Sequence, residues 1–329
     1  MNTAIDAAPR RLFRDREAAL YNSLVMAWTC LGWLASFVLM AQPAIALNLV
    51  GLLLCVHTMV LAAYLIHEAA HHTLFGNHTA NHRIGETMSF IAGASYASFE
   101  RIRHMHIRHH LDRADLVCFD FKRLLQRVPG LRRAVEALEW AYVPATELLM
   151  HLQVVWRPFL ERSQHRYRPR AAAILVARLG LLTLLGLWSM RALLLYGLAY
   201  LLFVHALNFF DAFHHTFDQY FVEPDEALPS SDRTAAYEQG NTYSNLISRR
   251  WPWLNLLVLN FGYHNAHHQR ASVPWYRLPA YHRELYGDSA AGEMPISRLL
   301  SAWHRDRVRR VFANDKFIGA HGVSFLTVI

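Results

Sequence analysis

The sequence is poor in charged residues and in cysteine. Asp, Glu, Lys and Arg make up only 18% of the 329 residues, whereas hydrophobic residues make up 53%. This shortage of charge predicts membrane segments, because about a quarter of an ordinary soluble domain is charged. The cysteines Cys30, Cys55 and Cys118 lack paired spacing, which argues against a disulfide framework or a thiolate metal site. We expect no secretory signal, because no small-residue cleavage site ends the first apolar run.

Four apolar runs account for the hydrophobic excess, at residues 24–41, 44–66, 171–188 and 192–210. A run of about 18 residues extends about 27 Å as an α-helix, close to the thickness of the hydrocarbon core. The runs form two close pairs, so we expect an all-α integral membrane protein with four transmembrane helices in two hairpins. Buried helices of a soluble protein are the alternative interpretation, which the number and pairing of the runs disfavour.

The remaining residues, 67–170 and 211–329, are expected to form a cytosolic helical cap in one domain with the spans, 1–329. Basic residues concentrate in these polar regions and before the first run, so both termini and the site are expected on the cytoplasmic side. The net charge of +8 favours an anionic membrane surface over nucleic acid as partner. Arg178 interrupts the third run and should either snorkel or face the bundle. Residues 134–156 look amphipathic.

Histidine is the residue in excess, with 21 copies. Three clusters share a spacing: HEAAHH at 67–72, HIRHH at 106–110 and HNAHH at 264–268. Positions i, i+3 and i+4 of a helix lie on one face, so the three imidazoles of the second and of the third cluster should converge, as should His67 and His71 of the first. Random placement would give the H-x-x-H-H pattern about 0.1 times, and it occurs twice. The predicted metal ligands are His67, His71, His106, His109, His110, His264, His267 and His268.

A fourth element, HALNFFDAFHH at 205–215, ends the last apolar run. Asp211 and His215 are four residues apart, so we expect His215 as a further ligand, with Asp211 holding its ring or a bound water. His214 is the alternative ligand at this position. His205 is more simply interpreted as a hydrogen-bonded histidine of the bundle.

The predicted ligand set is rich in nitrogen and lacks thiolates, which suits zinc, copper, iron or nickel. Eight strong candidates are too many for one ion, so we expect two ions with four or five ligands each. His72 turns away from His67 on the helix and is a weaker candidate. Nearby carboxylates could orient the imidazoles, or could form ordinary salt bridges with neighbouring arginines. These carboxylates are Glu68, Glu100, Asp112, Asp115 and Asp211, of which Glu68, Asp115 and Asp211 are the principal candidates.

The chain resembles the membrane fatty acid desaturase and hydroxylase superfamily. HEAAHH, HIRHH and HNAHH match its three histidine boxes in order, and the first box looks most like that of acyl-lipid desaturases. LNFGYHNAHH and VPWYRLPAYH are similar to the third box and the segment after it. The resemblance covers roughly residues 24–286 and implies two irons held by the box histidines. Some relatives supply a ligand from Asn-x-x-x-His; here the element reads Asp211-x-x-x-His215, so only the histidine carries over.

The resemblance implies O₂-dependent desaturation of a fatty acyl chain, whose unactivated C–H bonds require a redox metal and O₂. The substrate would be a lipid, a CoA ester or a carrier-bound chain. Electrons would come from a ferredoxin- or cytochrome-type donor and its reductase, because the sequence shows no haem or iron–sulfur motif. A hydroxylase or ketolase of lipids, alkanes or carotenoids is the alternative on the same scaffold. A membrane metal transporter or sensor is the alternative from another class, but it would place its ligands inside the spans.

Overall fold

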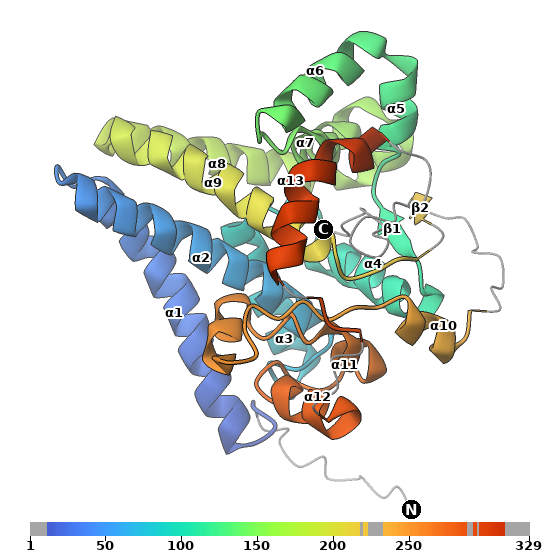
Figure 1. The fold of residues 1–329 in the computed structure, drawn as a ribbon. Helices are drawn as coiled ribbons and strands as arrows, with labels where there is room; N and C mark the ends of the chain where they lie inside the picture. The colour runs from blue at the N-terminus through green and yellow to red at the C-terminus, as the bar shows by residue number, and fades with distance from the viewer. Residues whose placement is uncertain (1–11, 218–219, 223–232, 288–291, 295, 313–329) are drawn as a thin grey trace, which may run out of the picture.

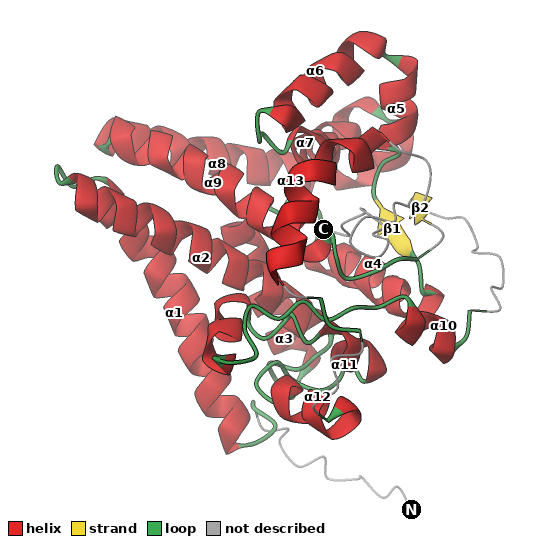
Figure 2. Ribbon diagram, in the orientation of Figure 1, coloured by secondary structure: helices red, strands yellow, loops and turns green. Residues whose placement is uncertain are grey.

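The structure is a computed structural model, and it describes residues 12–217, 220–222, 233–287, 292–294 and 296–312. Helices dominate these residues, and the two strands are short (Figure 2). Four long helices extend to one side, and shorter helices gather around their other end (Figure 1). The prediction of an all-α architecture is confirmed. The expected cytoplasmic location of the two termini concerns residues outside the described ranges.

Four helices of the described residues are long and apolar enough to cross a membrane, as predicted. They are α1 (Arg16–Met40), α2 (Ile45–Ala70), α8 (Arg168–Trp188, preceded by the 3₁₀ helix η1 at Arg162–Tyr167) and α9 (Met190–Asp211). The helices are longer than the apolar runs, because polar residues beyond the runs are also helical and cap the helix ends. The carboxylate of Asp15 accepts a hydrogen bond of 2.7 Å from the backbone N–H of Ala18 and thereby caps α1.

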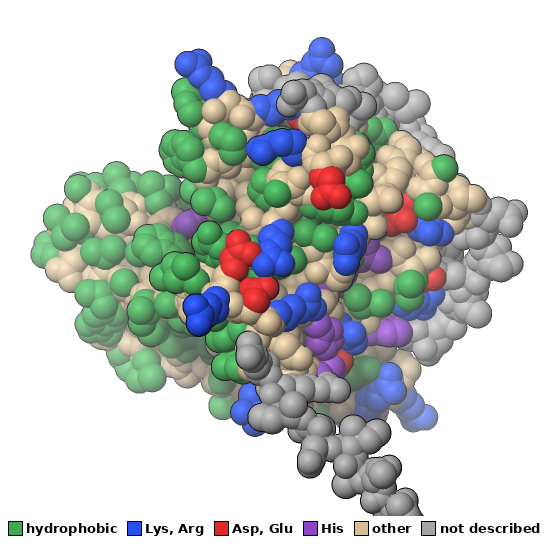
Figure 3. All heavy atoms as spheres, turned by 90° about the horizontal axis from the view of Figure 1, so that it is seen from below, with side chains coloured by type: hydrophobic (Ala, Val, Ile, Leu, Met, Phe, Trp, Pro, Cys, Tyr) green, Lys and Arg blue, Asp and Glu red, His purple; other side chains and the backbone are tan. Residues whose placement is uncertain are grey.

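Close helix packing holds the spans together at their glycines. A Cβ atom at Gly51 of α2 would lie 2.9 Å from the backbone nitrogen of Met40, at the end of α1. A Cβ atom at Gly32 of α1 would lie 2.9 Å from Cγ2 of Thr58. Small residues allow such close approach between membrane helices. Large apolar side chains cover the outer surface of the spans, whereas charged and histidine side chains gather on the other part of the molecule (Figure 3).

Arg178 faces the inside of the bundle, which decides between the two expected orientations. Its guanidinium lies over the ring of Phe90, 4.2 Å from the centroid, and donates hydrogen bonds to the Phe90 carbonyl and the Tyr196 hydroxyl. These partners compensate the cost of a buried cation within a span.

The first part of the cap lies between α2 and α8. Its elements are α3 (His78–Ala92), α4 (Phe99–Asp112), β1 (Asp115–Val117), α5 (Phe121–Arg127), α6 (Pro129–Trp140) and α7 (Ala145–Leu160). Residues 134–156, expected to be amphipathic, divide between α6 and α7. The helix ends before Tyr142, which has a positive φ of 61°, and Pro144 removes a backbone donor at the next helix start.

The second part of the cap follows α9. Its elements are β2 (Tyr220–Val222), α10 (Ala235–Gly240), the 3₁₀ helix η2 (Pro252–Val258), α11 (His264–Gln269), α12 (Leu278–Tyr286) and α13 (Ile296–Phe312). Strand β2 pairs in parallel with β1, which ties the two parts of the cap together. Helix α2 contacts η2, and α11 contacts α10 and α12. This arrangement brings the third histidine cluster to the end of α2.

Candidate metal centre

Five of the predicted histidines form one group at the end of α2. Each offers a ring nitrogen, and these nitrogens all lie within 4.8 Å of one another. The Nε2 atoms of His67 and His267 are 3.0 Å apart, and those of His71 and His106 are 2.7 Å apart. The Nε2 atom of His110 is 3.2 Å from those of both His106 and His267. We call these residues the first group: His67, His71, His106, His110 and His267.

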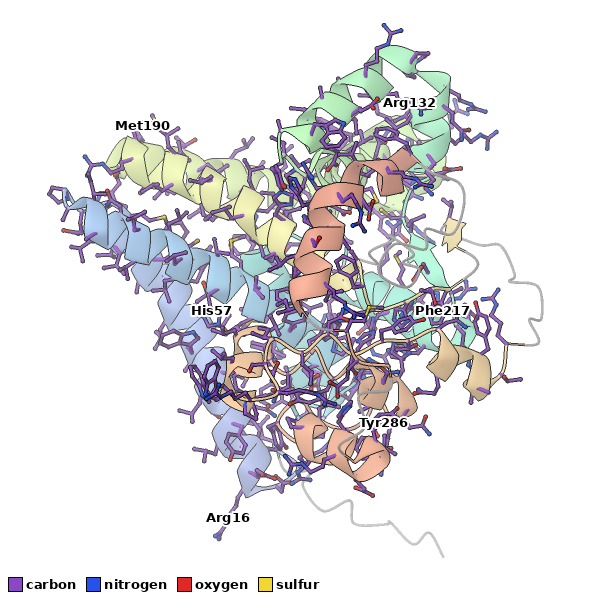
Figure 4. All side chains as sticks on the ribbon, viewed as in Figure 1. Arg16, His57, Arg132, Met190, Phe217 and Tyr286 are labelled. Carbon is purple, nitrogen blue, oxygen red and sulfur yellow. The ribbon has the colours of Figure 1, made fainter. Side chains whose placement is uncertain are left out.

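The second group contains the remaining predicted ligands, and all of its members are buried. Ring nitrogens of His109, His215 and His268 lie within 4.8 Å of one another. Nε2 of His264 is 2.8 Å from Nε2 of His215, which in turn is 3.1 Å from Nε2 of His109. The ring of Phe217, labelled in Figure 4, stacks on His215 with centroids 4.3 Å apart and lies 5.6 Å from the ring of His109. The second group is His109, His215, His264 and His268.

The second histidine cluster divides between the two groups instead of converging on one. His106 and His110 are one turn of α4 apart and enter the first group, whereas His109 faces the second. The physical reason is that α4 packs against different residues on its two sides. The rings of neighbouring residues on α4 therefore contact different histidines. The ring centroid of His109 nevertheless lies only 5.5 Å from that of His110, so the two groups are adjacent.

His72 lies in neither group. The backbone of His72 has a positive φ of 57° immediately after α2, and this turn directs its ring to His78, with centroids 5.0 Å apart. His71 keeps its ring in the first group because it occupies the last position before that turn. His205 also lies apart, against Tyr142 and Trp303.

The tautomers of two rings leave nitrogen lone pairs directed into the second group. Nδ1 of His109 donates to the carbonyl of Ala114 at 2.9 Å, so its Nε2 carries a lone pair. Nδ1 of His268 lies 2.8 Å from the Glu238 carboxylate, and its buried Nε2 has no hydrogen-bond partner among the described residues. Two nitrogens about 3 Å apart can share only one hydrogen, so a cation would satisfy these converging lone pairs. The residues present therefore fit two nitrogen-ligated metal ions.

Burial keeps these imidazoles neutral. It lowers the pKa of His109 to about 3, and it also lowers the pKa values of His110, His264 and His267. The neighbouring histidines lower these values further, because one charged ring would repel another. Neutral imidazole is the form that binds a metal ion, so the site is ready for metal at neutral pH.

Two of the three principal carboxylates lie where they can support rings of the groups. Oε1 of Glu68 is 3.5 Å from Nδ1 of His67. Its Oε2 accepts hydrogen bonds from Thr73 Oγ1, at 2.5 Å, and from the Trp275 backbone N–H, at 3.2 Å. Oδ1 of Asp115 is 3.8 Å from Nδ1 of His109, farther than the Ala114 carbonyl that this nitrogen bonds.

Asp211 lies beside His214 and not beside His215 as expected. Its Oδ1 is 3.8 Å from Nδ1 of His214, whereas Nδ1 of His215 is 3.2 Å from Oγ1 of Thr242. Helix α9 ends at Asp211, so the i, i+4 relationship does not continue to residue 215. His214 stacks on His264, with ring centroids 4.0 Å apart, but belongs to neither group.

Glu238 is a supporting carboxylate that the sequence did not reveal. It lies on α10, its Oε1 is 2.8 Å from Nδ1 of His268, and its Oε2 accepts a 2.9 Å hydrogen bond from Nε of Arg113. Burial raises the pKa of the Glu238 carboxyl, but the bonds to His268 and Arg113 outweigh burial and leave the pKa below its usual range. The segment AAYEQG has no histidine beside it, so only the folded chain identifies this residue.

A cavity of about 130 Å³ borders both histidine groups. His67 and His106 of the first group line it, as do His109, His215 and His264 of the second. Apolar side chains of α9, including Phe203, Val204 and Leu207, form part of its wall. The cavity therefore gives a small apolar segment access to both candidate metal positions.

A comparison with protein families matches residues 43–299 to the family described as fatty acid desaturase. The matched segment covers more than half of the chain and includes all nine histidines of the two groups. No curated protein matches the sequence.

Proposed function

The chain belongs to the fatty acid desaturase family, and from this premise we propose that it introduces a C=C bond into a fatty acyl chain with O₂ and two irons. Family membership and four membrane-compatible helices make it a membrane protein of an oxidoreductase family. The observation that carries the specific proposal is the convergence of nine imidazoles in two adjacent groups beside one cavity. A nitrogen-rich, thiolate-free set of this kind suits iron.

The first group would hold one iron with five imidazoles, and the second group would hold the other with four. When bound, two reduced irons would supply the electrons and the O₂ chemistry needed to oxidise an unactivated C–H bond. The protein contributes positioning. The Ala114 carbonyl and Glu238 fix the orientation of His109 and His268. Glu68 lies 3.5 Å from Nδ1 of His67.

The substrate would approach through the cavity between α2, α7 and α9. The apolar part of its wall and the burial of the second group would shield the reacting carbon from bulk water. We further propose a lipid, CoA-linked or carrier-bound acyl chain as substrate, and a ferredoxin- or cytochrome-type donor with its reductase as electron source. From the distribution of basic residues along the sequence we also propose that the cap and both termini lie in the cytoplasm.

Hydroxylation is the second candidate reaction, because a lipid, alkane or carotenoid hydroxylase or ketolase would use the same two groups. The form of the first box, HEAAHH, favours desaturation. A metal transporter or sensor is disfavoured, because the ligand candidates lie in the cap or at a helix end. The only one within a candidate span is His67, in the last turn of α2.

The direct test compares the wild-type protein with His109→Ala in a bacterial host, using lipidomics and iron analysis. In cells with the wild-type protein we expect lipids that have lost two hydrogens, and about two irons per chain in the purified protein. For His109→Ala we expect neither result, although the variant still inserts in the membrane. His104→Ala is the matched control, because His104 is an exposed residue of the same helix. Products that have gained one oxygen would indicate hydroxylation. Full iron content and activity in His109→Ala would contradict the ligand assignment.

A further inference from the structure

Hydrogen-bonding side chains from three helices line the cavity beside the metal centre. Tyr64 comes from α2, Glu147 and His151 from α7, and Asn208 and Asp211 from α9. Tyr64, Asn208 and Asp211 belong to candidate membrane spans, where polar side chains are costly and usually mark a functional site. An unbroken hydrocarbon chain would have no hydrogen bond to offer any of these five residues.

Three polar atoms of this wall are buried without a partner among the described residues. They are the hydroxyl of Tyr64, Oδ1 of Asn208 and Nε2 of His214. The three residues are 4%, 3% and 2% exposed. Buried polar groups are nearly always hydrogen-bonded in folded proteins, because an unsatisfied group loses its interaction with water. Three such atoms at one cavity therefore indicate a bound partner.

At most one aromatic ring separates the Tyr64 and His214 side chains from the histidine groups. Tyr64 stacks on Phe261 with centroids 4.5 Å apart, and Phe261 lies 4.9 Å from both His67 and His264. His214 stacks directly on His264. A group bound by these atoms would thus lie close to the carbon that faces the metal positions.

The wall is rich in hydrogen-bond acceptors. Oδ1 of Asn208 is an acceptor without a partner among the described residues. Nε2 of His214 is a second acceptor in the tautomer whose Nδ1, 3.8 Å from the carboxyl of Asp211, carries the ring hydrogen. The carboxyls of Glu147 and Asp211 add further acceptor atoms. No described residue that lines the cavity is a lysine or an arginine. This chemistry favours a ligand group that donates hydrogen bonds over an anionic one.

We infer that the substrate of the proposed reaction carries a hydroxyl or amino group near the reacting carbon, and that Tyr64 and Asn208 bind this group. The inference rests on the proposed function for its reacting carbon. A hydrogen bond at this point fixes which carbon faces the histidines, whereas a chain of identical methylenes can slide along the cavity. Tyr64 and Asn208 are therefore specificity-determining residues.

The test measures binding to the iron-loaded, full-length protein in lipid nanodiscs. Three ligands of equal chain length are compared: an alkane, its primary alcohol and its primary amine, each corrected for partition into lipid. We expect the alcohol or the amine to bind about tenfold or more tightly than the alkane, as one or two hydrogen bonds would produce. The alcohol and the amine, measured separately, identify which donor the wall prefers.

Two variants test whether the cavity wall causes the preference for the alcohol or the amine. Tyr64→Phe removes only the hydroxyl, and Asn208→Leu removes the amide, so either should bring the ratio of affinities towards one. Tyr21→Phe is the matched control, because Tyr21 is 39% exposed on α1 and does not line the cavity. Iron content of each variant shows whether the metal centre is intact, and Asn208→Leu gives an independent result if Tyr64→Phe fails to fold.

Equal affinity of the wild type for all three ligands would overturn the inference and would mean that water satisfies the wall. A preference that survives both variants would also overturn it. A protein that holds two irons and oxidises unsubstituted acyl chains, but shows no preference, would refute this inference and leave the proposed function standing. A protein that shows the preference without iron or oxidation would refute the proposed function instead.

Discussion

The Nδ1 atom of His268 lies 2.8 Å from Oε1 of Glu238, although 30 residues separate the two along the chain. This contact sets the tautomer of a buried ring whose other nitrogen faces His109 and His215. Arg113 holds the carboxylate from its other oxygen. A single side chain of α10 thus controls one candidate ligand of the second group.

Glu238→Gln should weaken metal binding by the second group. The amide keeps the shape of the side chain but loses the charge that polarises His268, and changes of this kind typically cost about 10–100-fold in metal affinity or activity. Iron per chain and product yield measure the effect. Glu161→Gln is the control, because Glu161 follows the last residue of α7, pairs with Arg157 and belongs to neither histidine group. Normal iron affinity in Glu238→Gln would show that the Glu238 charge does not matter for the site.

Gly51→Ala should destabilise the packing of α1 on α2. The new Cβ would lie 2.9 Å from the backbone nitrogen of Met40, which cannot move without displacing the helix end, so a loss of about 1–3 kcal/mol is expected. Gly180→Ala on α8 is the matched control, because nothing lies within 4 Å of its Cβ position. Thermal unfolding in detergent compares the two variants. An equal effect of both substitutions would contradict the close approach.

Metal-free protein should lose stability on acidification. In the unfolded chain His109 takes up a proton near its ordinary pKa of 6.5, whereas burial lowers the folded pKa to about 3. The unfolded state therefore holds more protons between these values, and the free energy of unfolding falls as pH decreases from about 6.5 towards 3. His110, His264 and His267, whose pKa values burial also lowers, act in the same direction. Melting temperatures of chelator-treated protein at pH 7.5 and 5 measure the loss, and equal values would contradict neutral burial.

The fold and the candidate ligands could be read from the sequence to the extent that they depend on local periodicity. Four apolar runs predicted four spans, and i, i+4 spacing predicted that His106 and His110 would meet. The helix ends could not be predicted. Helix-capping residues and packing against the helical cap extend α1 back to Arg16 and α2 on to Ala70. The ligand roles of the nine histidines stay predictions until a metal is measured.

Relationships between distant segments were beyond the reach of the sequence. The assignment of His109 to a different group from His110 depends on how α4 packs against the segments around His215 and α11. Glu238 meets His268 only because α10 lies against α11. The displacement of Asp211 towards His214 follows from where α9 ends, which spacing alone does not determine.

The same two helices, α4 and α11, carry residues of both histidine groups. His109 and His110 are neighbours on α4 and belong to different groups, and so are His267 and His268 on α11. A rotation of either helix therefore displaces a ring of each group together. An ion bound at either group would therefore restrain helices that also carry ligand candidates of the other group.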